Sequence, residues 1–127
     1  MRYLTADELA AINSRLAIRA GQQPGIKNAE QLDKIIAVPQ SNFYDQSLHE
    51  MVANKTGFLM DSIISGKPFV HMNLQTAAVA VAALADLNDY QLTFTDDELI
   101  NLVKRVNQHE VGATDLFVIF NSHLKQK

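Results

Sequence analysis

The stretch Thr76-Ala-Ala-Val-Ala-Val-Ala-Ala-Leu-Ala85 decides the fold, because its residues are apolar or small on every side. A helix that is hydrophobic all round is normally buried all round. The alanine side chains also allow neighbouring helices to approach closely. We therefore expect this stretch to form the central helix of a bundle, ending near the turn signal Asn88-Asp89.

Capping-box patterns mark the starts of further helices on both sides of this stretch. The segments Thr5-Ala-Asp-Glu8, Ser47-Leu-His-Glu50 and Thr95-Asp-Asp-Glu98 each place a hydroxyl three residues before a glutamate. In this pattern the two side chains satisfy two unpaired amide groups reciprocally. Asn28-Ala-Glu-Gln31 is a weaker example, and Thr114-Asp115 indicates one more helix start.

Behind these starts, apolar side chains recur at the three- and four-residue spacing of a helix face. The sets expected to share a face are Leu9, Ile12 and Leu16; Leu48, Val52, Leu59 and Ile63; Leu99, Leu102, Val103 and Val106; and Leu116, Ile119, Phe120 and Leu124.

Breaks in the pattern separate the expected helices. Residues 21–25 contain Gly and Pro and predict a loop, Pro39 ends the short second helix, and Gly66-Lys67-Pro68 ends the third. Only Gln91-Leu-Thr-Phe94 alternates, and it is too short to found a sheet. These features predict an all-α fold, a compact bundle of about six helices around a buried central helix, with residues 1–127 as a single domain.

Composition narrows the classes of function. The chain has 127 residues and no cysteine, which excludes disulfides and thiolate metal sites. A net charge of −3 argues against a DNA- or RNA-binding surface. The N-terminus is polar, and the longest weakly polar run is about half the length that crosses a bilayer. We therefore expect a soluble, cytoplasmic protein without nucleic-acid or membrane partners.

The loop before the central helix reads Lys67-Pro-Phe-Val-His-Met-Asn-Leu-Gln-Thr76. A loop that enters the N-terminus of a buried helix is a natural anion site, because free amides and the helix dipole point outward together. Taken alone this signal is unspecific, since every helix has an N-terminus.

This loop resembles the motif of the Fic/Doc (Fido) family, His-Pro-Phe-x-Asp/Glu-Gly/Ala-Asn-Lys/Gly-Arg-Thr, which an alanine-rich helix follows. Pro68, Phe69, Asn73 and Thr76 match that motif. The rest of the chain resembles the short, toxin-type death-on-curing (Doc) branch. The features shared with that branch are Tyr3-Leu4-Thr5, Glu8-Leu9, Pro24-Gly25-Ile26, Leu32, Pro39-Gln40, Phe43, Asn88-Asp89-Tyr90 and Asp97-Glu98-Leu99.

The resemblance implies transfer of a phosphate-containing group from a nucleotide to a protein hydroxyl, with ATP and Mg²⁺ as cofactors. In the family the histidine acts as general base, the acidic residue holds Mg²⁺, and Lys and Arg stabilise phosphate charge. The target class of Doc-type members is a translation elongation factor. An antitoxin partner inhibits them by laying a helical segment into a groove on the toxin.

The groups that would carry this chemistry are replaced here, so the Fic motif is degenerate. Lys67 stands at the base position, and a charged ammonium group cannot accept a proton. His71 stands at the metal position, although Mg²⁺ prefers carboxylate oxygen. Met72 replaces the small residue, and Leu74 and Gln75 replace the two cations. We therefore expect no intact catalytic residue, no bound cofactor and a pseudoenzyme.

Phe69, Asn73 and Thr76 are the residues that remain for a phosphate or nucleotide loop. Structural roles compete with this one: Asn73 is favoured as the N-cap of the central helix, and Thr76 can bond back within the helix. His71 is interpreted as a loop histidine rather than as the family histidine in a shifted register. None of the four histidines has metal-ligand spacing, so no metal site is predicted.

Three functions follow from these residues. The favoured one is a Doc-like toxin–antitoxin protein that is catalytically inactive and binds an antitoxin-like protein or the translation elongation factor. The alternative is a phosphoryl- or nucleotidyltransferase with altered loop chemistry, using Lys67, His71 or Asn73. A decayed prophage or plasmid remnant is the third.

Overall fold

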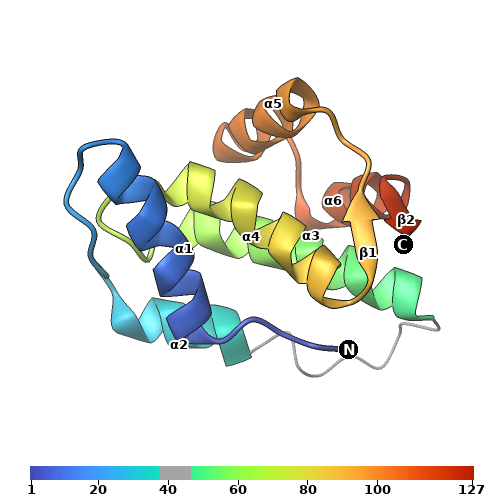
Figure 1. Cartoon of the computed structure of the whole chain (residues 1–127). Helices are drawn as coiled ribbons and strands as arrows, with labels where there is room; N and C mark the ends of the chain where they lie inside the picture. Colours follow the sequence, from blue (N-terminus) through green and yellow to red (C-terminus); the bar gives the residue numbers. More distant parts are fainter. Residues whose placement is uncertain (38–46) are drawn as a thin grey trace.

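Six helices and one small two-stranded sheet make up the part of the chain that the computed structural model describes, residues 1–37 and 47–127 (Figure 1). The domain is compact and mostly helical. Its elements are α1 (Ala6–Arg19), α2 (Ala29–Ala37), α3 (Leu48–Gly66), α4 (Asn73–Leu87), β1 (Tyr90–Leu92), α5 (Asp96–Asn107), α6 (Ala113–Asn121) and β2 (Leu124–Gln126). The predictions for Pro39, Pro39-Gln40 and Phe43 fall outside the described residues.

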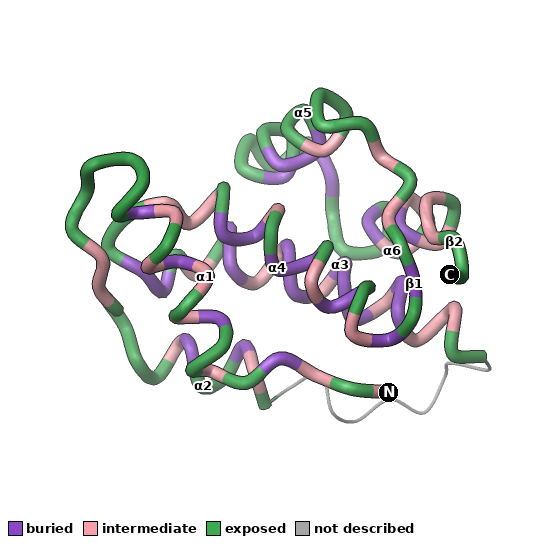
Figure 2. The backbone as a smooth tube through the Cα atoms, in the orientation of Figure 1, coloured by how far each residue is buried: buried purple, intermediate pink, exposed green. Residues whose placement is uncertain are grey.

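Helices α3 and α4 lie side by side at the centre of the domain (Figure 1). Helix α1 packs on α4 and α2 on α3, while α5 and α6 cover the opposite side. All six helices contribute buried residues, which are purple in Figure 2. Gly57 in α3 permits close approach of α6, because a Cβ at this position would lie 3.3 Å from Cβ of Leu116.

The predicted central helix is α4, but it is not buried on every side. Ala77 and Ala80 are fully buried, on the side of α4 that packs within the domain. An open stripe runs along the other side of the helix, where Val79 is 42% exposed and Gln75, Ala82 and Asp86 are exposed. This exposed stripe could not be predicted from the alanine-rich sequence, because alanine occurs on both buried and exposed faces of helices.

The predicted helix starts are largely correct. Thr5 with Glu8 and Thr95 with Glu98 form complete capping boxes, and Ser47 accepts from the amide of Glu50. Asn28 likewise accepts a hydrogen bond from the Gln31 amide. The last start was placed wrongly, because α6 is capped at Gly112, whose amide donates to the Asp115 carboxylate.

Two of the predicted apolar faces need correction. On α1 the buried line is Leu9, Asn13 and Ala17, and the predicted Ile12 and Leu16 flank it. A buried asparagine interrupts the apolar pattern there and shifts the apparent face by one position. Leu48, predicted in the core, is the first residue of α3 and is exposed.

The expectation of a fold without a sheet was wrong at the C-terminus. Strand β1 pairs antiparallel with β2, with Tyr90 opposite Gln126 and Leu92 opposite Leu124. Helix α6 therefore ends at Asn121, and Leu124 lies in a strand rather than on the last helix face. Such pairing joins segments more than thirty residues apart, which local periodicity does not reveal.

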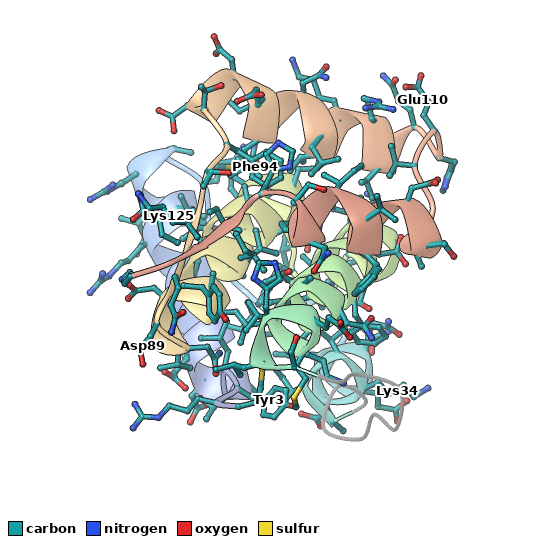
Figure 3. The ribbon with its side chains drawn as sticks, turned by 90° about the vertical axis from the view of Figure 1, so that its right-hand side faces the viewer. Tyr3, Lys34, Asp89, Phe94, Glu110 and Lys125 are labelled. Carbon is teal, nitrogen blue, oxygen red and sulfur yellow. The ribbon has the colours of Figure 1, made fainter. Side chains whose placement is uncertain are left out.

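Aromatic packing around Phe94, which is labelled in Figure 3, stabilises this corner of the domain. Phe94 follows β1, and its ring stacks on His123 at 4.2 Å and meets Phe120 edge-on at 5.6 Å between centroids. The Thr93 amide donates to the His123 carbonyl, so the chain segments after β1 and before β2 are joined. Within the described residues, no helix combines the length and apolar character needed to cross a membrane.

We predict that removing the α5 cap destabilises the domain. The Thr95 hydroxyl accepts from the Glu98 amide at 3.2 Å. Loss of such a cap costs about 0.5–2 kcal/mol, so Thr95→Ala is expected to lower the free energy of unfolding in urea by that amount. Thr93→Ala, an exposed threonine that caps no helix, is the control and should change it by less than about 0.5 kcal/mol. Equal effects of the two variants would contradict the capping role.

The same capping box predicts a pH dependence. The Thr95 amide, which donates to Glu98 at 2.8 Å, holds the pKa of that carboxyl below its ordinary value. Stability from the ionised carboxylate is therefore present above the unfolded-state pKa and is lost as the pH falls through the folded-state pKa. The stability advantage of the natural chain over Glu98→Gln should shrink on going from pH 7 to pH below about 4. A difference that is independent of pH would contradict the bond.

Candidate functional site

The candidate site is the loop that connects α3 to α4, together with the first turn of α4. Lys67 and Met72 lie at its two ends with φ of 43° and 63°, in the left-handed region. Residues with a side chain adopt this conformation reluctantly, and glycine adopts it readily. The chain therefore turns sharply at both positions, so that the loop folds back over the N-terminus of α4.

A second segment of the chain holds the loop in place from outside. The amide of Lys27 donates to the carbonyl of Pro68 at 2.8 Å, and the amide of Val70 donates to the carbonyl of Gly25 at 3.0 Å. Gly25 favours this approach, because a Cβ there would lie 3.3 Å from the Val70 side chain, which is a tight contact. The loop is thus one half of a short antiparallel pairing.

Asn73 closes the loop from inside. Its Oδ1 accepts from the Phe69 amide at 3.0 Å, and its Nδ2 donates to the Phe69 carbonyl at 2.9 Å. The prediction that Asn73 caps the helix was wrong, because Met72 is the N-cap and Asn73 is the first helical residue. The oxygen and the nitrogen of the Asn73 side-chain amide thus both bond to the backbone of Phe69, which closes a hydrogen-bonded ring. The Phe69 side chain is buried.

Asn13 of α1 anchors the loop from below, and sequence reasoning missed it. Its side chain is almost fully buried, and its Nδ2 donates to the His71 carbonyl at 2.7 Å and to the Thr76 hydroxyl at 3.0 Å. The buried Thr76 side chain therefore faces α1, and its hydroxyl accepts this bond. The available signal was a polar residue four positions after Leu9, on the buried side of α1.

Lys67 is tied to helix ends on both sides of it. Its Nζ donates to the Ile64 carbonyl at 3.0 Å and to the Asn107 side chain at 3.1 Å. An ammonium group beside the C-terminus of α3 also interacts favourably with the helix dipole. The residue at the predicted base position is thus exposed but engaged, and it is bonded to two acceptors of its own chain.

The two positions where the family motif places phosphate-binding cations carry no charge in this chain. Leu74 packs partly against the core, and Gln75 is exposed. Both line a pocket of about 390 Å³ between α4 and α5, together with Ala78, Val79, Ile100, Val103 and Lys104. Lys104 is the one charged residue in that lining, and Ile100 is 50% exposed.

His71 lies exposed in the loop, which agrees with its interpretation as a loop histidine. Among the described residues, no group of three or more His, Cys, Asp or Glu side chains lies close enough together to hold a metal ion. What the structure brings together at the loop is therefore a set of amide, hydroxyl and apolar groups with one histidine and one lysine.

Comparison with known proteins does not identify a family for this chain. No protein-family model matches its sequence, and no curated protein matches it. The likeness of residues 67–76 to the Fic motif therefore remains a prediction from the residues themselves.

We predict that glycine suits position 72 better than alanine does. Both Met72→Gly and Met72→Ala remove the same side chain, so their difference isolates the backbone conformation. An L-residue in the left-handed region costs about 1–2 kcal/mol, so the glycine variant should be the more stable by about 1 kcal/mol in urea unfolding. An alanine variant of equal or greater stability would contradict the left-handed turn.

The Asn13 anchor can be tested by a double-mutant cycle with Thr76. Asn13→Ala and Thr76→Ala should each destabilise the domain by about 1–3 kcal/mol, because each leaves a buried polar group without its partner. The two effects should couple by about 1 kcal/mol, since the side chains are bonded directly. Ser14→Ala, on the half-buried neighbour, is the control and should change stability by less than about 0.5 kcal/mol. Additive effects would contradict the bond.

Proposed function

We propose that this chain is a non-catalytic Fic/Doc-like protein of the toxin–antitoxin type, which acts by binding another protein. The observation that supports the proposal is that the polar groups of the loop form hydrogen bonds within the chain. Asn73 and Lys67 are both bonded within the chain, and the Asn13 amide holds the His71 carbonyl. These groups shape the loop instead of facing a substrate.

The chemistry of the loop supports an inactive protein. Phosphoryl transfer depends on a positioned base, a metal ligand and cations that stabilise phosphate charge. Residues 67–76 contain no Asp, Glu or Arg, and their one lysine is bonded to Ile64 and Asn107. A lost general base alone slows a reaction by about 10²–10⁴-fold.

The backbone of the loop supports the relation to the Fic/Doc family. Met72 has a φ of 63°, the conformation that glycine adopts without strain, and the family motif places a glycine or alanine at this position. Asn73 and Thr76, two residues that match the motif, hold the loop against Phe69 and α1. The matching residues thus have structural roles, and the substituted ones are those that would carry chemistry.

The surface beside the loop supports binding to a protein. Val79 and Ile100 expose apolar side chains on the two sides of the pocket between α4 and α5, where Leu74 and Gln75 replace cations. Exposed apolar surface rimmed by polar groups is typical of interaction sites. The partners we propose are an antitoxin-like protein and the translation elongation factor that Doc-type members target.

Restoring the motif tests whether only the chemistry was lost. The variant combines Lys67→His, His71→Asp, Met72→Gly, Leu74→Lys and Gln75→Arg. We expect it to transfer phosphate from radiolabelled ATP to a purified translation elongation factor and to arrest growth, whereas the natural chain does neither. Labelling by the natural chain would contradict the proposal. A folded but inactive restored variant would argue against the family relation.

Nucleotide binding separates the inactive protein from a transferase with altered chemistry. We expect no change in melting temperature with millimolar ATP or GTP, with or without Mg²⁺. A saturable increase that Lys67→Ala abolishes would support the altered transferase instead.

Partner binding is tested with a matched pair of surface variants. Val79→Glu should weaken binding to the antitoxin-like protein or elongation factor at least tenfold in calorimetry. Val118→Glu changes a valine on α6 that is even more exposed and should leave affinity unchanged. If the natural chain binds neither protein, a decayed remnant becomes the better account.

A further inference from the structure

A second pocket lies between α1 and the segment that supports the loop. Its volume is about 300 Å³, which is in the range of small-molecule sites. Ala10, Pro24, Ile26 and Phe69 give it apolar walls, and the remaining lining includes Asn13 and Ser14. No charged side chain of the described residues lines it, so a neutral ligand suits it better than an ion.

Asn13 supplies this pocket with a free hydrogen-bond acceptor. The His71 carbonyl can only accept, so the atom 2.7 Å from it must be Nδ2, and the orientation of the amide is determined. Nδ2 also donates to Thr76, which uses both of its hydrogens. Among the described residues nothing donates to Oδ1, although the residue is only 1% exposed.

An amide oxygen that has no donor within the protein can accept a hydrogen bond from a ligand or from water. In the described part of the chain, the one side-chain oxygen that is both buried and without a partner belongs to Asn121. Oδ1 of Asn13 has no partner and is not that atom, so it is accessible from outside the protein. Because Asn13 lines the pocket, its Oδ1 is open to what occupies that space.

We propose that this pocket binds a neutral, ring-sized small molecule whose O–H or N–H donates to Oδ1 of Asn13. Pro24 and the half-exposed Ile26 provide apolar surface for the ring, and the Ser14 hydroxyl offers a second polar contact. The inference is independent of the proposed protein partner, because this pocket lies on the α1 side of the loop and not between α4 and α5.

Phenol and anisole are matched probes for this site, because they share a ring and differ in the donor. We expect phenol to bind with a millimolar dissociation constant and to shift the NMR signals of the Asn13 side-chain amide and the Gly25 backbone amide. Anisole should bind about 5–10-fold more weakly, the difference that one hydrogen bond makes. Equal affinities, shifts centred elsewhere, or no saturable shift with phenol would overturn the proposal.

Blocking variants locate the site. Ala10→Leu places a larger side chain in the pocket and should abolish the phenol shifts, whereas Ala11→Leu, on an exposed neighbouring position, should leave them unchanged. If circular dichroism shows that Ala10→Leu does not fold, Ser14→Leu provides the same test from the next turn of α1. Unchanged phenol binding in a folded blocking variant would contradict the assignment.

Discussion

The buried amide of Asn13 is the interaction on which the rest of the loop depends. It joins α1 to the His71 carbonyl and to the Thr76 hydroxyl, which lie 58 and 63 residues further along the chain. A buried polar group must be paired, so the position of α1 and the path of the loop are determined together. The start of the central helix is determined with them.

Other polar groups of the loop also form hydrogen bonds within the chain. Asn73 closes a ring with Phe69, and the Lys27 and Val70 amides join the loop to the segment before α2. Groups that are engaged in internal hydrogen bonds must break them to bind a phosphate, which lowers affinity. The proposed inactivity thus has two causes: the chemical groups are replaced, and those that remain have structural partners.

Local signals predicted much of the fold but not its polar interior. Capping boxes placed α1 and α5 correctly, because Thr5 and Thr95 act within one helix turn. The β1–β2 pairing was missed, since it depends on a segment more than thirty residues away. The face of α1 was shifted because a buried asparagine breaks the apolar pattern. Its tertiary hydrogen bonds to the His71 carbonyl and the Thr76 hydroxyl explain its burial.

The candidate site was predicted by position more than by geometry. Resemblance located residues 67–76. The left-handed conformation of Met72 and the hydrogen-bonded ring between Asn73 and Phe69 became apparent only from the backbone structure. We propose that this loop is a structural element and not a nucleotide site. An NMR titration of its backbone amides with ATP and Mg²⁺ tests that most directly. We predict unchanged signals for residues 67–76, with slow hydrogen exchange of the Phe69 amide. Saturable shifts centred on residues 73–75 would contradict the account.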